Sequence, residues 1–160
     1  MTAEELQRFC AGKSDSRTYF LEPWSRGERT YATNGHILVS VWRIQGVSEN
    51  AHAPDVAKLF ADAKTGKWMP VPKTAMPADI PCRWCHGTGR EPEDRRVKCG
   101  SCNGQKTEPD YITRTTICHA VFANRYLALI QGWEIAPKNK SDKARIRCDD
   151  AEGLLMPMRT

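Results

Sequence analysis

Residues 82–89 read CRWCHGTG, and residues 99–104 repeat the same design as CGSCNG. Two residues between paired cysteines allow both sulfurs to face one tetrahedral ion, and the glycines that follow permit the positive φ angles that turn backbone amides toward thiolates. The pattern predicts one structural Zn²⁺ in a small knuckle, residues 81–109, inserted into a larger domain. The predicted ligands are Cys82, Cys85, Cys99 and Cys102.

Two other interpretations of these cysteines remain open, namely a redox C-x-x-C pair and four reduced thiols without metal. Redox pairs normally begin a helix in a βαβ setting, so two matching copies flanked by glycines favour a metal. His86 adjoins Cys85 as an alternative ligand, although four cysteines suffice. Four thiolates leave no open position for water or substrate, so a structural role is predicted. Cys10, Cys118 and Cys148 are expected to be ordinary core thiols.

The 160 residues are 40% hydrophobic and 27% charged, which is typical of a globular chain with one core. No stretch approaches the ~20 apolar residues of a membrane span, and the acidic start at Glu4 and Glu5 differs from a signal peptide. Together with the paired cysteines, this predicts a cytoplasmic location. The formal net charge of +5, reduced to +3 by four thiolates and one Zn²⁺, permits a polyanionic partner without requiring one.

Before the knuckle, the sequence predicts two helices and a hairpin. A capping box begins at Thr2, with apolar residues following at helical spacing. A second helix should begin at Pro54-Asp55 and stop near Gly66, and the prolines of residues 67–81 predict an extended connection. The expected strands are residues 18–21 and 29–42, joined by a turn at residues 25–28.

After the knuckle, the pattern predicts a strand at residues 111–119 and a helix at residues 124–131, with Asn124 as its N-cap and Gly132 beyond its end. Two closing strands follow, residues 144–149 and 153–159. The fold class is therefore α+β. Residues 1–80 and 110–160 form one domain of two halves, each a helix with strands.

Three segments of the larger domain resemble the bacterial replicative sliding clamp, the β subunit of DNA polymerase III. LLMPMR at residues 154–159 is similar to its C-terminal strand, and TYATNGHIL at residues 30–38 resembles its A-T-D-G-H-R-L strand, with Asn34 in place of Asp and Ile37 in place of Arg. VFANRYLALI at residues 121–130 is similar to its last helix. The resemblance implies a single clamp-like domain of bacterial or phage origin, acting in the bacterial cytoplasm.

The cysteine motifs resemble half of the zinc-binding region of DnaJ-type chaperones, whose repeats read C-x-x-C-x-G-x-G. Lys106 stands where the second copy would end in glycine. Two copies imply one zinc. Chaperone function does not follow, because the chain has no J-domain pattern.

The clamp resemblance implies a groove for short hydrophobic peptides of polymerases, clamp loaders and repair proteins. Leucine and methionine would form an adaptable apolar wall, and an arginine could hold a peptide carboxylate. In the clamp the two groove strands come from adjacent domains, so a head-to-tail homo-oligomer is one way to rebuild the groove. The candidate groove residues are Thr33, Gly35, His36, Ile37 and Leu38, with Leu154, Leu155, Met156, Pro157, Met158 and Arg159.

A non-enzymatic protein of DNA metabolism that binds replication proteins is the first expectation, and a zinc-stabilised adaptor or decoy for clamp-binding peptides is the alternative. An enzyme is disfavoured, because the carboxylates at Asp149, Asp150 and Glu152 suit a solvated turn. DNA could bind basic residues around the cysteines with an aromatic ring to stack on a base, although the same residues suit solubility and a covered zinc site equally well. These candidates are Arg83, Trp84, Arg90, Arg95, Arg96, Lys98 and Lys106.

Overall fold

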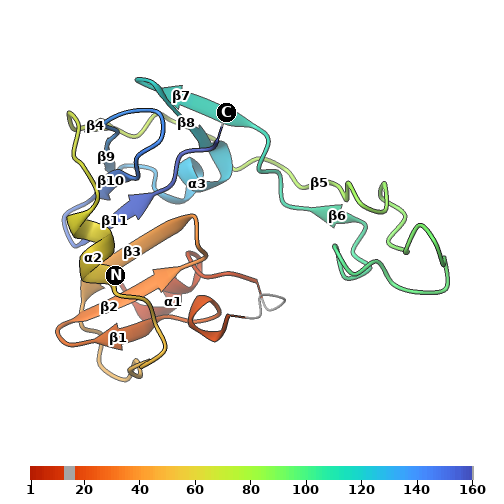
Figure 1. Ribbon diagram of the computed structural model, residues 1–160, viewed down its shortest axis with the longest axis horizontal. Helices are drawn as coiled ribbons and strands as arrows, with labels where there is room; N and C mark the ends of the chain where they lie inside the picture. The colour runs from red at the N-terminus through yellow and green to blue at the C-terminus, as the bar shows by residue number, and fades with distance from the viewer. Residues whose placement is uncertain (13–16, 160) are drawn as a thin grey trace.

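The computed structural model describes residues 1–12 and 17–159, and a seven-stranded antiparallel sheet forms its centre (Figure 1). The strand order is β1-β2-β3-β11-β10-β9-β4. Few and short helices accompany the sheet, so the expected α+β class is confirmed. No helix among the described residues is both long and apolar enough to cross a bilayer. The helices are α1 (Ala3–Gln7), the 3-10 turn η1 (Thr18–Phe20), α2 (Val56–Ala61) and α3 (Asn124–Leu129).

The sheet consists of two three-stranded meanders joined at their third strands. The first meander, β1 (Trp24–Arg26), β2 (Arg29–Thr33) and β3 (Ile37–Trp42), follows α1. The second, β9 (Glu134–Ala136), β10 (Ala144–Arg147) and β11 (Ala151–Leu155), follows α3. β3 pairs with β11 in antiparallel register, with Leu38 opposite Leu154. Each half is therefore a helix followed by three strands, and β4 (Met69–Pro70) extends the second half at the edge.

The two faces of the sheet bury different clusters, because side chains alternate along each strand. On one face, Ile37 and Val39 of β3 share a core with Leu6 of α1 and Leu127 of α3. The rings of Phe9 and Trp133 meet there at 6.2 Å. On the opposite face, α2 covers a smaller cluster, which contains Trp24, Leu38, Ala53, Val56, Ala63 and Leu154.

The predicted hairpin of the first half is partly wrong. Residues 18–20 form a 3-10 turn in which the amide of Phe20 donates to Arg17, and the first strand begins later, at Trp24. The long run from residue 29 to 42 is two strands, because Gly35 takes a φ of +90° and the Asn34 side chain accepts from the amides of His36 and Ile37. Glycine is favoured at such an angle, and an Asn that bonds nearby amides closes a turn.

The second half also differs in detail. Residues 121–123, which the clamp resemblance placed in the last helix, belong instead to strand β8 (Ala120–Ala123), which pairs with β7 (Arg114–Ile117) in a separate hairpin. Asn124 is the first helical residue rather than the N-cap, since its side-chain oxygen accepts from the hydroxyl of Thr115 at 2.7 Å. The closing hairpin turns at residues 148–150, and β11 ends at Leu155. Cys118 is exposed in the β7–β8 turn and not in the core.

The cysteine segment projects from the sheet as a long extension, drawn in green in Figure 1. Its stem is a two-stranded pair of β5 (Ile80–Pro81) and β6 (Thr107–Glu108). We call residues 81–109 the arm and the rest of the chain the body. The buried hydrophobic cluster in the arm consists of the four cysteines.

Candidate metal centre and adjoining groove

The four cysteine sulfurs at the centre of the arm could hold a metal ion. All four lie within 4.8 Å of one another, with 3.9 Å between Cys82 and Cys99 and 3.8 Å between Cys85 and Cys102. A tetrahedral ion with metal–sulfur bonds of about 2.3 Å separates its sulfurs by about 3.8 Å. The four side chains are buried. Spacing, ligand type and burial therefore fit a closed tetrathiolate site.

The two cysteine motifs have the same backbone hydrogen bonds, so the second motif repeats the local structure of the first. The amide of Gly87 donates to Cys82 and that of Gly104 to Cys99, each over 3.2 Å. The copies also hold each other, because the amide of Cys82 donates to the carbonyl of Lys106 and the amide of Cys99 to that of Gly89. The repeat therefore positions two sulfurs from each copy.

The missing glycine of the second copy is replaced without loss of geometry. Lys106 takes a φ of +71°, close to the +77° of its counterpart Gly89. The two positions differ in the space around them: a Cβ on Gly89 would lie 2.8 Å from the carbonyl oxygen of Gly104. Only the first copy therefore requires glycine for packing as well as conformation, which explains why the sequence departs at Lys106.

A backbone amide also affects the pKa of one of the cysteine thiols. Burial raises the pKa of the Cys85 thiol, but the Gly89 amide, 3.2 Å from its sulfur, and the neighbouring thiols outweigh burial and lower the pKa to about 6. A thiolate is the form that binds metal. For Cys99, by contrast, burial is the largest effect and raises the pKa to about 11. The surroundings of Cys85 therefore favour the thiolate form more than those of Cys99 do.

The side chain of Glu91 links the two copies from outside. Its carboxylate accepts from the Gly100 amide and from Nε1 of Trp84, at 2.5 and 2.8 Å, and these contacts hold its pKa below the usual range. Trp84 is 58% exposed, so most of its ring remains available to solvent.

The basic residues proposed for nucleic acid all lie exposed on the arm, but their charge is balanced. Arg83 pairs with Glu108, and Arg90 donates to the carbonyl of Arg96. Residues 81–109 contain six basic side chains against four carboxylates, and four thiolates outweigh a divalent ion by two charges. The metal-loaded arm is therefore neutral overall, and DNA binding by Arg83, Trp84, Arg90, Arg95, Arg96, Lys98 and Lys106 stays a prediction.

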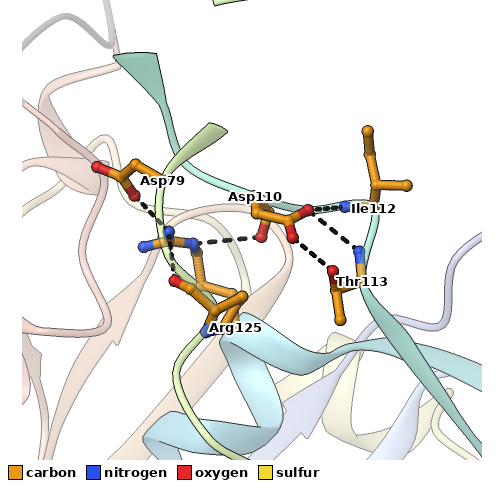
Figure 2. A network of polar contacts seen from close by, with 6 residues as sticks. Asp79, Asp110, Ile112, Thr113 and Arg125 are labelled. Carbon is orange, nitrogen blue, oxygen red and sulfur yellow. Dashed lines mark hydrogen bonds and ion pairs between the residues drawn. The ribbon is translucent and has the colours of Figure 1, made fainter. Parts of the chain in front are cut away.

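A polar network attaches the stem of the arm to α3 (Figure 2). The buried carboxylate of Asp110 accepts from the amides of Ile112 and Thr113 and from the Thr113 hydroxyl, and these bonds hold its pKa below the usual range. Arg125 of α3 donates to the Asp110 carbonyl and pairs with Asp79 at 2.6 Å. The guanidinium of Arg125 therefore connects the segment that enters the arm, at Asp79, with the segment that leaves it, at Asp110.

We expect Asp110→Asn to lower the thermal midpoint by several degrees at neutral pH, because it removes the charge that three donors stabilise. A carboxyl whose pKa is lowered on folding contributes stability above its unfolded pKa and loses it as the pH falls through the folded value. The difference between wild type and variant should therefore shrink below about pH 4. Thermal melts over a pH series test this, with the exposed Asp149→Asn as control. A difference that grows in acid would contradict it.

A groove lies where the exit from the arm meets the body. Its volume is about 860 Å³, and its walls are the turn at residues 34–36, the tail at residues 156–159, and the rings of Tyr111 and Tyr126. The imidazole of His36 stacks on Tyr126 and Tyr126 adjoins Tyr111, both at 5.7 Å between centroids. Burial raises the pKa of Tyr126, so its hydroxyl stays protonated.

The structure brings together six of the eleven residues expected in the groove, Gly35, His36, Met156, Pro157, Met158 and Arg159. The two segments are joined in one chain, since the Met156 amide donates to the His36 carbonyl over 2.8 Å. The other expected residues do not line it, because strand alternation buries them elsewhere. Ile37 and Leu155 lie in the main core, Leu38 and Leu154 face α2, and the Thr33 hydroxyl donates to the Ile37 carbonyl.

Sequence reasoning missed the contributions from other elements. The sequence pattern places Tyr111 in a strand and Tyr126 on a buried helix face, and it gives Arg17 no role. A helical pattern identifies which face of α3 is buried, but it does not show which residues on that face border a cavity. No local motif indicated these residues.

The comparisons with known proteins add no relationship. No model of a protein family matches the chain, and no curated protein matches it.

Proposed function

We propose that this is a non-enzymatic, clamp-like protein of DNA metabolism that binds short apolar peptide segments of partner proteins in the groove, and that the ion in its arm is zinc. The observation that carries the proposal is the contact between the Gly35-His36 turn and the Met156–Arg159 tail. Both segments resemble the parts of sliding clamps that receive such peptides. Four thiolates at tetrahedral spacing are the ligand set that zinc prefers in structural sites.

The architecture of the body supports a clamp-like domain. Clamp domains consist of two units of a helix with strands, and this body has two helix-plus-meander halves joined at β3 and β11. Both half-helices, α1 and α3, pack on the same face of the sheet.

The chemistry of the groove suits a peptide with apolar side chains. Met156 is 40% exposed, and methionine adapts its shape to different partners. Tyr111, which also lines the groove, and its neighbour Ile112 are exposed as well. Arg159 at the other end offers a cation for a peptide carboxylate. Exposed apolar surface of this kind, rimmed by polar groups, is typical of an interaction site.

A monomeric adaptor or decoy that binds clamp-binding peptides without DNA is a second candidate, and the sheet edges favour it. β3 lies between β2 and β11, and β11 between β3 and β10, so neither groove strand has an edge for a second subunit. At the outer edges, the Ser25 amide of β1 is bonded to Ser48, and β4 is two residues long and contains Pro70. This arrangement supports a groove that needs no second subunit.

We expect Met156→Asp to weaken peptide binding at least tenfold, because it places a charge in an apolar wall. The probe is a fluorescein-labelled clamp-binding peptide of a bacterial replicative polymerase, and the measurement is fluorescence anisotropy. Met76→Asp is the matched control, since Met76 is 47% exposed and lies outside the groove.

Equal affinities in the two variants, or no binding by wild type, would refute the peptide groove. Mass measured in solution separates the two candidates. A particle of 18.1 kDa supports the adaptor, and a closed multiple of this mass supports the clamp.

A further inference from the structure

Two lysine-bearing segments meet at one end of the sheet, away from the arm. One is the stretch after α2, residues 62–67, and the other is the loop between β9 and β10, residues 137–143. They are in contact, because the amide of Gly66 donates to the carbonyl of Ala136 over 3.3 Å. We call their basic side chains the lysine surface: Lys64, Lys67, Lys138, Lys140 and Lys143.

The contact between the segments is close and fixed from both sides. A Cβ on Gly66 would lie 1.9 Å from the carbonyl oxygen of Pro137, so the backbones approach at a distance that only glycine permits. Arg145 of β10 holds the other end, since its guanidinium donates to the carbonyls of Phe60 and Ala63 at 2.8 and 3.4 Å. The fold therefore holds the five lysines near one another.

The positive charge of this surface is only partly compensated within its two segments. Residues 62–67 and 137–143 contain five lysines against two carboxylates, Asp62 and Asp142. Asp142 accepts from the side-chain amide of Asn139 at 2.9 Å. Within residues 1–12 and 17–159, every salt bridge uses an arginine or the N-terminal amine, and none uses a lysine. Like charges held together without partners repel one another, and a polyanion would relieve that repulsion.

We propose that the lysine surface binds the phosphodiester backbone of duplex DNA without regard to sequence. Thr65 and Ser141 lie among the lysines and add hydroxyl donors of the kind that commonly contact phosphates. None of the exposed large hydrophobic side chains of the described chain lies in these two segments, whereas membrane-binding surfaces usually insert such side chains.

Stacking on single-stranded bases is also disfavoured at this surface. The nearest aromatic ring in the sequence, Trp68, has the guanidinium of Arg147 at 4.1 Å from its centroid, so one face of the ring is occupied. Single-strand binders normally offer free aromatic faces. The proposal does not depend on the peptide groove, which lies against other elements.

The test measures the anisotropy of labelled duplexes of two unrelated sequences over a series of salt concentrations. Wild type should bind both equally, with affinity falling steeply as salt rises. Lys138→Gln/Lys140→Gln/Lys143→Gln should weaken binding at least tenfold and reduce the salt slope by about 0.9 for each phosphate that the variant no longer neutralises. Lys64→Gln/Lys67→Gln, in the other segment, should act in the same direction.

The matched control removes three exposed charges that lie outside both the arm and the lysine surface, as Arg8→Gln/Lys73→Gln/Arg114→Gln, and should change affinity less than about threefold. Equal losses in the control and surface variants would show an effect of bulk charge and overturn the proposal. So would unchanged binding in both surface variants, absence of DNA binding at low salt, or binding to phosphatidylserine vesicles without binding to DNA.

Discussion

Replacement of Cys99 by serine is expected to abolish metal binding and unfold the arm while the body stays folded. The buried cluster of the arm is the four cysteines, so a metal bound there would take the place of a hydrophobic core. Structural zinc in small domains contributes about 10–16 kcal/mol of apparent binding free energy. Elemental analysis should show that metal content falls from one ion per chain in wild type to none in the variant.

Hydrogen exchange should show which part of the molecule responds. The amides of Cys82, Gly87 and Gly104, which are bonded within the arm, should lose protection, and those of β3 and β11 should keep it. Cys118→Ser is the control, because this thiol is exposed in the β7–β8 turn. Full metal content in the Cys99 variant, or loss of protection throughout the sheet, would refute a separate metal-dependent arm.

Gly153→Ala should cost the body about 3 kcal/mol or more, the upper end of the range for overpacking. Gly153 lies in β11 between Val39 of β3 and Ile146 of β10. An added Cβ would lie 2.2 Å from the carbonyl oxygen of Leu38, and a backbone atom in a central strand cannot move without separating the two halves. Urea denaturation measures the change in free energy of unfolding.

The control for this substitution is Gly12→Ala, where the added Cβ meets no atom within 4 Å and φ is not positive. Its effect should stay within about 0.5 kcal/mol. If both variants unfold at the same urea concentration, the junction of β3 and β11 is not the tight contact described above.

The sequence was most informative where chemistry is local. The cysteine spacing predicted which four side chains converge, and the capping box at Thr2 was confirmed. The helix after Asp55 was confirmed at its start, but it ends at Ala61 rather than near Gly66. Turns that depend on a single residue were harder to place. Asn34 and Gly35 divide what the sequence pattern predicts as one continuous strand. The break costs less free energy because the Asn34 side chain accepts from the His36 and Ile37 amides, which lose their strand hydrogen bonds at the turn.

The groove was only partly predictable, for a different physical reason. Motif resemblance identified the Gly35-His36 turn and the tail, but it could not say which residues of those strands point into the cavity. β alternation sends Ile37 and Leu155 into the core, and the tail leaves the sheet at Met156. Tyr111 reaches the groove because the arm ends beside α3, which is a relation between distant segments.

The pairing of β5 with β6 has a consequence for how the protein folds. Strands β3 and β11 must find each other across more than two thirds of the chain, and such remote pairing is slow. The arm forms through near-neighbour contacts, and its stem brings Ile80 opposite Glu108. If the arm closes early on a metal ion, the loop that the body must close is shorter by almost the whole insertion, so early metal capture should speed assembly of the sheet.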